Sequence, residues 1–171
     1  PNVVFISINM ISLSNDKIIS RSTAMIDDDI YVTGTIGDSA IGLHILKEKI
    51  TKIKLSDLNR NTLINRYYLP EPNIKYSELI HRFATSAMDT TDGLLNDLKN
   101  LSIRSRKDFS INLDRIPYSD ATREFLIQFD DYDIANFGGD DYQCIFSAKK
   151  ADRKLISDFA LEQNIQVTKI G

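Results

Sequence analysis

The sequence contains little glycine, one cysteine, two histidines and no tryptophan. Only 7 of its 171 residues are glycine, fewer than the roughly 7% usual for globular proteins. A chain this sparing in glycine is expected to keep it where the backbone geometry demands it. Six of the seven fall in three places, which are Gly34 to Gly42, Gly93, and Gly138 with Gly139. These three places are therefore the first candidates for functional loops.

The scarcity of cysteine and of basic residues excludes several classes of protein. The lone Cys144 cannot form an intrachain disulfide, and His44 and His81 offer no zinc-ligand spacing. This cysteine usage favours a reducing, cytoplasmic compartment. With 21 Lys and Arg against 24 Asp and Glu, no basic surplus exists for a nucleic-acid backbone. The apolar stretch near the start, Val3 to Ile8, is too short to cross a membrane. We expect neither a nucleic-acid nor a membrane partner.

Periodicity and turn residues predict intermixed strands and helices. A length of 171 residues has room for one ordinary domain. Strands are predicted over 3–8, 17–19, 30–33, 86–88, 109–113, 142–146 and 165–170. Helices are predicted over 38–49, 57–67, 76–85, 92–106, 121–129 and 152–162. The intermixing predicts an α+β or α/β class, in which helices cover a mixed β-sheet.

The most natural domain boundary lies near residues 20–29. There a predicted strand pair gives way to three aspartates, Asp27 to Asp29, which we interpret as a solvated turn. Residues 28–171 are expected to form one domain, and residues 1–27 to be the last strands of another domain with a linker. The chain opens on Pro1 rather than Met, directly before a strand-like segment. This opening suggests a piece of something longer.

The segment Asp89-Thr90-Thr91-Asp92-Gly93-Leu94 lies where a short strand is predicted to meet the N-terminus of a helix. Two carboxylates three residues apart at such a junction can face one way. One or two carboxylates completed by phosphate oxygens and water suit Mg²⁺, and the helix N-terminus favours anions. In isolation, however, the same pattern also describes two capping aspartates around a threonine turn.

Two further glycine loops each allow a functional and a structural interpretation. In Gly138-Gly139-Asp140-Asp141-Tyr142-Gln143, the glycines permit close approach of the backbone to a ligand, and the acids can accept hydrogen bonds or a cationic group. The alternative is a tight turn with solvated aspartates. The segment from Val32 to Gly42 lacks the Gly-Lys-[Ser/Thr] ending of a P-loop, so we expect a structural turn there, with Gly42 in close helix–sheet packing. Arg21 either holds a nucleotide phosphate or is a surface residue.

Taken in order along the chain, these segments resemble thiamine-monophosphate kinase. The resemblance spans nearly the whole chain, and its most specific part is the pair formed by Asp89-x-Thr91-Asp92-Gly93-Leu94 and Gly138-Gly139-x-Asp141-Tyr142. The remaining motifs are Arg21-Ser22-x-Ala24, residues 28–43 with Gly34, Gly37 and Asp38, Arg66-Tyr67-x-x-Pro70-x-Pro72, and Pro117-x-Ser119. Aminoimidazole ribonucleotide synthetases, selenophosphate synthetases and hydrogenase-maturation dehydratases share the layout but differ in these motifs.

The resemblance implies a fold like the C-terminal domain of aminoimidazole ribonucleotide synthetase and the transfer of the γ-phosphoryl of ATP to thiamine monophosphate. It implies Mg²⁺ at Asp89 and Asp92, ATP contacts from Arg21 and Thr91, and a substrate contact from Asp140. It also implies an N-terminal ATP-binding domain, missing from this chain, and a homodimer at full length. Without that domain, the chain alone is expected to be inactive.

The sequence also departs from the family pattern. The family's glutamate is Asp140 here, and its Gly-Ala-Lys-Pro-Gly stretch is Thr23-Ala24-Met25-Ile26-Asp27. An aromatic residue that contacts substrate near the family's C-terminus has no counterpart before Gly171. Two alternatives stay open at this stage. One is another ATP-dependent synthetase of the superfamily, which the motif pair disfavours, and the other is a non-catalytic binding module.

Overall fold

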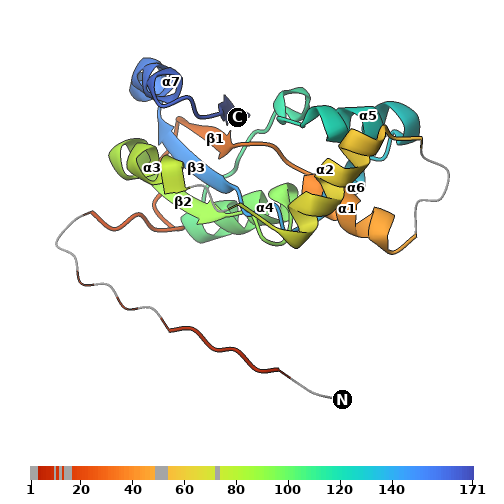
Figure 1. Cartoon of the computed structure of the whole chain (residues 1–171). Helices are drawn as coiled ribbons and strands as arrows, with labels where there is room; N and C mark the ends of the chain where they lie inside the picture. The colour runs from red at the N-terminus through yellow and green to blue at the C-terminus, as the bar shows by residue number, and fades with distance from the viewer. Residues whose placement is uncertain (1–3, 10, 12, 14–16, 49–53, 72–73) are drawn as a thin grey trace.

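A four-stranded β-sheet lies at the centre of the domain, with helices on both of its faces (Figure 1). The structure is a computed structural model and describes residues 4–9, 11, 13, 17–48, 54–71 and 74–171. Within these residues the strands are β1 (Asp28–Thr33), β2 (Ala84–Asp89), β3 (Cys144–Lys149) and β4 (Val167–Lys169). The helices are α1 (Asp38–Leu46), α2 (Asp57–Tyr68), α3 (Ser77–Phe83), α4 (Leu94–Ser105), α5 (Asp120–Phe129), α6 (Tyr132–Phe137) and α7 (Arg153–Glu162). The predicted α+β class is confirmed.

The sheet has the order β2-β3-β1-β4, and each of these neighbouring pairs is antiparallel. The prediction of a mixed sheet, with parallel as well as antiparallel pairs, is therefore wrong. Strands β1 and β2 do run in the same direction, as the intermixed helices suggest, but β3 lies between them and pairs antiparallel with both. The register places Tyr31 opposite Phe146, where the two rings stack with centroids 5.1 Å apart.

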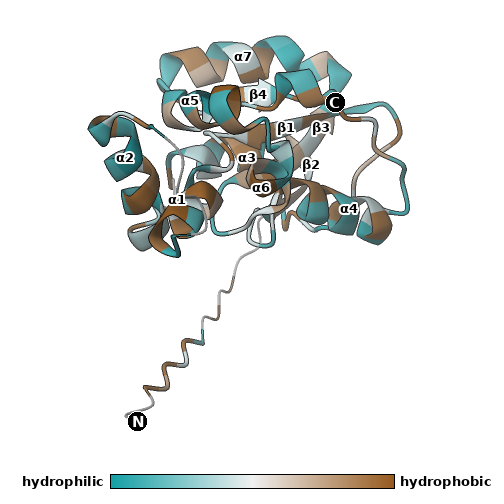
Figure 2. Ribbon diagram, turned by 90° about the vertical axis from the view of Figure 1, so that its right-hand side faces the viewer, coloured by the Kyte–Doolittle hydropathy of each residue, from teal (hydrophilic) through white to brown (hydrophobic). Residues whose placement is uncertain are grey.

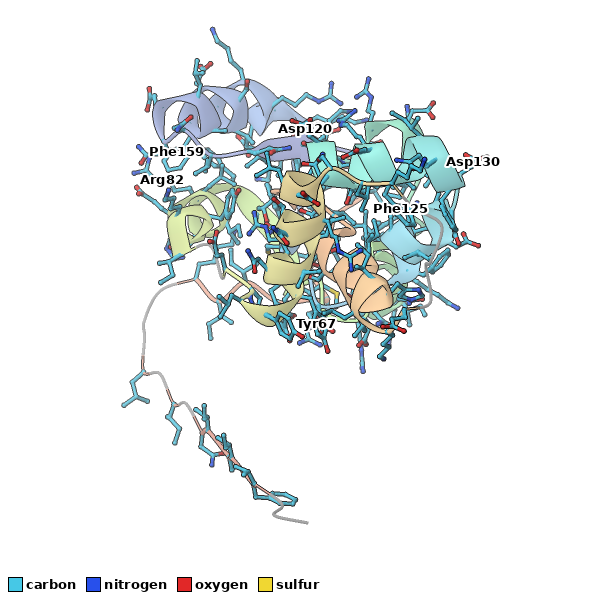
Figure 3. All side chains as sticks on the ribbon, turned by 45° about the vertical axis from the view of Figure 1, so that its right-hand side comes forward. Tyr67, Arg82, Asp120, Phe125, Asp130 and Phe159 are labelled. Atoms are coloured by element: carbon cyan, nitrogen blue, oxygen red, sulfur yellow. The ribbon has the colours of Figure 1, made fainter. Side chains whose placement is uncertain are left out.

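Side chains alternate between the two faces of the sheet, and each face packs in its own apolar cluster. Ile30, Val32 and Ile145 pack against α4 through residues such as Leu98. On the opposite face, a second cluster contains residues of β1, β2, β3, α3 and α7, namely Tyr31, Leu79, Ala84, Phe146, Ala148, Ile156 and Phe159. Arg82 of α3 lies over the ring of Phe159, 5.2 Å from its centroid, at the edge of this second cluster (Figure 3).

Helices α1, α2, α5 and α6 form a third cluster beyond one end of the sheet (Figure 1). Phe125 of α5, labelled in Figure 3, is fully buried there, as is Leu63 of α2. Gly42 was expected to permit helix–sheet packing, but its close neighbour is a helix. A Cβ atom at Gly42 would lie 2.1 Å from the carbonyl oxygen of Leu63. The prediction of close packing is confirmed, and its partner is α2 rather than the sheet.

Residues 4–9 lie away from the domain in both views (Figure 1 and Figure 2), whereas Ser20 is bound to it, since its carbonyl oxygen accepts a hydrogen bond from Ala87 N at 3.3 Å. The described residues 4–9 and 17–19 belong to no strand, so the two strands predicted here are not found. The apolar side chains of residues 4–9 are exposed, Phe5 to 95%, and a strand without a neighbour leaves its backbone hydrogen-bonding groups unpaired. That residues 1–27 belong to another domain stays a prediction. Among the described helices, none combines the length and apolar character that a membrane span requires.

The strand predicted over 109–113 is also wrong. Its alternation reports burial correctly, since Phe109 and Ile111 pack against the α4 cluster. However, its backbone binds the chain just after β4 through a hydrogen bond from Asn112 N to Ile170 O, of 2.7 Å, without forming a ladder, and Leu113 already belongs to a short 3-10 helix (Leu113–Arg115). The prediction for 142–146 begins two residues early, because Tyr142 has a φ of 50°, which no strand residue adopts. Helix α6 was not predicted at all.

Asp29 was expected in a solvated turn but is buried. Its side chain is 3% exposed and pairs with Arg153 and Lys169. The guanidinium of Arg153 donates from both Nε and Nη2, and these hydrogen bonds hold the pKa of Asp29 below its usual range. A buried carboxylate is stable only with such partners. Asp29 is therefore a structural residue that joins β1 to α7 and β4.

Candidate functional site

The two most specific sequence motifs meet in space. The loop after β2 (residues 89–93) and the loop before β3 (residues 138–143) are hydrogen-bonded side by side. Asp140 N donates to Thr91 O and Tyr142 N to Thr90 O, both at 3.0 Å. In the other direction, Thr90 N donates to Gln143 O at 2.8 Å. We call these segments the 89–93 loop and the 138–143 loop. About fifty residues separate them in sequence, and they form one surface.

Two glycines permit this close approach. Gly93 has a φ of 108°, and a Cβ atom there would lie 2.5 Å from the carbonyl carbon and oxygen of Phe137. At Gly139 a Cβ atom would lie 2.1 Å from Thr91 O. Real Cβ atoms do not approach backbone atoms so closely, so any side chain at either position separates the loops. The prediction that scarce glycine marks sites of geometric demand is confirmed at both.

Asp97, in the first turn of α4, binds the backbone of the 89–93 loop. Its Oδ2 accepts hydrogen bonds from Thr91 N at 2.8 Å and Asp92 N at 3.0 Å, and its side chain is buried. Sequence reasoning missed this residue. The signal was present, because Asp97 lies on the same helix face as Leu94, Leu98 and Leu101, and a carboxylate on an apolar face must be hydrogen-bonded.

The predicted site residues gather around these loops. Asp89 and Asp92 are exposed, and Arg21 Nη2 lies 4.0 Å from Asp89 Oδ1, with both side chains more than half exposed. Thr91 and Asp140 are half-buried and share the backbone hydrogen bond described above. The five positions predicted to bind metal, nucleotide and substrate thus lie on or beside the joined loops.

Asp141 points the opposite way from Asp140, into the domain. Its carboxylate accepts hydrogen bonds from Gly37 N at 2.7 Å and Ser39 N at 3.2 Å, at the start of α1. The N-cap position of this helix is Gly37, which has no side chain to cap it. The cap is instead supplied by a residue about a hundred positions away, so the 138–143 loop is fixed to α1 as well as to the 89–93 loop.

Asp38 does not cap α1, and its carboxylate instead binds the motif at residues 117–119. Its carboxylate accepts hydrogen bonds from Thr35, Ser119 and Thr122, and Ser119 itself caps α5 by accepting from Thr122 N at 3.0 Å. The backbone makes the same connection through Ile36 N and Pro117 O, at 2.9 Å. The motif at 34–42 is therefore a structural turn, as predicted, tied to the motif at 117–119.

Burial makes the carboxyl group of Asp141 an unusually weak acid. Desolvation raises its pKa to about 7, and Asp38 adds to this rise, while the two backbone donors and Arg66 oppose it. Because this folded-state pKa exceeds the unfolded value, the contribution of Asp141 to stability is complete at acidic pH and is lost as the pH rises through 7.

We therefore expect the stability of the chain to fall relative to Asp141→Asn as the pH rises. Between pH 5 and pH 8 the difference in their free energies of unfolding should change by about 2 kcal/mol, at no more than about 1.4 kcal/mol per pH unit. Urea unfolding followed by circular dichroism at each pH measures it. A difference that is constant between pH 5 and 8, or that changes with the opposite sign, would rule out a raised pKa at Asp141.

A cavity of about 750 Å³ lies elsewhere, between residues 25–30, 106–110 and the ends of β4 and α7. Several cationic side chains line it, but three of them already form ion pairs. Arg153 and Lys169 bind Asp29, and Lys150 lies 3.4 Å from Asp27. No motif residue that was predicted to bind metal, nucleotide or substrate lines this cavity. The joined loops, rather than this cavity, are the candidate functional site.

No protein-family model matches this chain, but several curated relatives and solved structures that resemble it are thiamine-monophosphate kinases. The thiamine-monophosphate kinase of Escherichia coli O157:H7 is 35% identical over 137 residues, which are 80% of this chain and 42% of that enzyme. The crystal structure of thiamine-monophosphate kinase from Stenotrophomonas maltophilia K279a superposes with a TM-score of 0.80 at 32% identity, over 90% of this chain and 49% of that one.

Two further structures bear on ligands and on the fold. AaThiL complexed with AMPPCP and TMP matches with a TM-score of 0.73 at 28% identity, over 90% of this chain and 47% of that chain. HypE of Escherichia coli, a hydrogenase maturation protein, shares the fold at 15% identity with a TM-score of 0.60, over 90% of this chain and 46% of that chain. The resemblance to thiamine-monophosphate kinases that the motifs predict is thus confirmed over most of this chain, which spans a little under half the length of the relatives it matches.

Proposed function

We propose that this chain forms one half of a kinase that transfers the γ-phosphoryl of ATP to the phosphate of thiamine monophosphate, giving thiamine diphosphate and ADP. One observation carries the proposal above the others. The two loops whose sequences distinguish this family within its superfamily are hydrogen-bonded together, through Asp140 N to Thr91 O and Tyr142 N to Thr90 O. A metal and nucleotide motif thereby adjoins a substrate motif.

The proposed roles follow from what phosphoryl transfer requires. Two polyanions must be brought together, so catalysis rests on positioning and on neutralising charge rather than on covalent chemistry by the protein. In this proposal Arg21 and Thr91 contact ATP, and Asp140 contacts thiamine monophosphate. The exposed guanidinium of Arg21, 4.0 Å from Asp89, can turn to an incoming phosphate, since an exposed ion pair contributes little to stability.

The acidic residues fit Mg²⁺ as a partial donor set. Asp89 and Asp92 offer exposed carboxylate oxygens, the ligand type that Mg²⁺ prefers. In the part of the chain that the structure describes, no group of three or more candidate metal ligands occurs, so ATP phosphates, water or another domain must complete the coordination. When bound, Mg²⁺ would supply the positive charge that lets two carboxylates lie beside phosphate.

The remaining partners belong to the proposal as well. An N-terminal domain of the same protein would supply further acidic ligands and ATP contacts, and the full-length protein would be a cytoplasmic homodimer. The further domain is supported by the share of the relatives that this chain spans, which is 42% for the Escherichia coli O157:H7 enzyme.

Comparison of the full-length gene product with the 171-residue chain tests the proposed function. With ATP, Mg²⁺ and thiamine monophosphate, we expect the full-length protein to form thiamine diphosphate and the chain alone to form none. Chromatography with fluorescence detection after oxidation of the thiamine compounds measures the product. Thiamine diphosphate formation by the chain alone would contradict the need for a second half, and none from the full-length protein would contradict the function.

A further inference from the structure

Tyr142 is an exposed aromatic residue beside the proposed substrate contact. Its side chain is 42% exposed, and its hydroxyl donates to Asp140 Oδ1 at 3.3 Å. The ring and the carboxylate therefore form one small surface on the 138–143 loop.

The direction of the ring is fixed by the loop on both sides. Asp141 and Gln143 are buried, and Asp141 is bound to the start of α1 through Gly37 N and Ser39 N. The backbone amide of Tyr142 is bound to Thr90 O. Because the residues on either side point inward, the side chain of Tyr142 points outward.

The backbone at this position is strained. Tyr142 has a φ of 50° and Asp140 a φ of 70°, and a bulky side chain with positive φ is an unfavourable outlier. Such strain persists only where the surroundings over-determine it, and it concentrates at functional sites. A residue that is 42% exposed recovers only part of this cost by burial, so stability alone does not explain the presence of tyrosine here.

The charges around the ring favour a cation. The pKa of Tyr142 is raised chiefly by the negative charge of Asp140, and Asp89 adds to the rise. Arg21 lies beside one of these carboxylates, Asp89. A flat cationic ring laid on Tyr142 would gain both the attraction of the aromatic face and that of the neighbouring carboxylates.

We infer that Tyr142 contacts the acceptor substrate, and that its ring holds the positively charged heteroaromatic ring of that substrate while Asp140 balances the charge. The inference rests on the proposed function, since the thiazolium of thiamine monophosphate is such a ring. It names a specificity residue for that site. A phosphate ester without a cationic ring would lack this contact.

Three variants of the full-length protein test the inference. Tyr142→Asn removes the ring and suits the left-handed backbone, so its melting temperature should equal or exceed that of the natural protein. Its KM for thiamine monophosphate should rise about tenfold, the size of a partly desolvated cation–π contact, while the KM for ATP stays within about twofold. Tyr142→Phe keeps the ring and should stay within about threefold on both. Tyr68→Asn, at an exposed tyrosine of α2, is the matched control and should change neither KM.

Two results would overturn the inference. One is an unchanged KM for thiamine monophosphate in Tyr142→Asn, and the other is a loss in Tyr142→Phe as large as in Tyr142→Asn. Titration calorimetry with thiamine, which carries the ring but no phosphate, separates this inference from the proposed function. If the natural full-length protein binds thiamine more tightly than Tyr142→Asn does, ring recognition stands even where no phosphoryl transfer is found. Equal binding, or no binding, contradicts it.

Discussion

Replacing Gly93 by alanine is expected to destabilise the domain by about 4 kcal/mol and to separate the two motif loops. Its φ of 108° is unfavourable for alanine, and the added Cβ atom would lie 2.5 Å from the carbonyl of Phe137. Backbone strain of this kind costs about 1–3 kcal/mol, and the clash with fixed backbone adds to it, because Phe137 cannot move without displacing Gly138 and Asp140. Urea unfolding measures the loss, and hydrogen exchange at the amides of Asp140 and Tyr142 reports the separation.

The matched control for this variant is Lys99→Ala, at an exposed position of α4. It introduces the same residue into the helix that follows the loop, and it should stay within about 0.5 kcal/mol of the natural chain. If Gly93→Ala lay within that range too, and the two amides remained protected, the close approach of the loops would be contradicted.

Removing the Asp97 carboxylate is expected to have the second largest effect. Asp97→Ala leaves Thr91 N and Asp92 N without their acceptor and should cost about 3 kcal/mol, because hydrogen bonds to a charged group contribute about 1.5–3 kcal/mol each and water partly replaces them. Both bonds go to Oδ2, so the amide oxygen of Asp97→Asn can keep them and should limit the loss to about 1 kcal/mol.

Thermal and urea unfolding of the two Asp97 variants, measured side by side, tests this account. The account requires Asp97→Ala to be the less stable by a clear margin. Equal losses in the two variants would mean that charge at the N-terminus of α4, rather than the two hydrogen bonds, is what matters.

Local rules predicted the elements whose residues decide their own structure. Helix α5 was found because apolar residues recur there at helical spacing, and the structure adds a cap at Ser119. Strand β1 was found because Ile30 to Thr33 is a run of β-branched and aromatic residues that ends at Gly34. These elements lie close to their predicted bounds. The strand predicted over 109–113 failed for the opposite reason. Its alternation is real, but strand formation depends on a partner, and no pattern within five residues reveals whether one exists.

The candidate site was predictable in its members but not in its connections. The motifs named the residues of both loops, and their glycines marked where the backbones approach. The contacts of Asp97 with the 89–93 loop and of Asp141 with α1 depend on burial and on tertiary packing over as many as 104 residues. Asp29 shows the same limit, because three consecutive aspartates give no local sign that one of them is buried against Arg153.

The central claim is that the two joined loops form one site for phosphoryl transfer to thiamine monophosphate. Its most direct test is to give the full-length gene product ATP labelled at the γ-phosphoryl and to follow the transfer of the label. The account predicts labelled thiamine diphosphate, with a rate that falls by about a hundredfold or more when either Asp89, on one loop, or Asp140, on the other, is replaced by alanine. Label transfer that persists at the natural rate in both variants would contradict it.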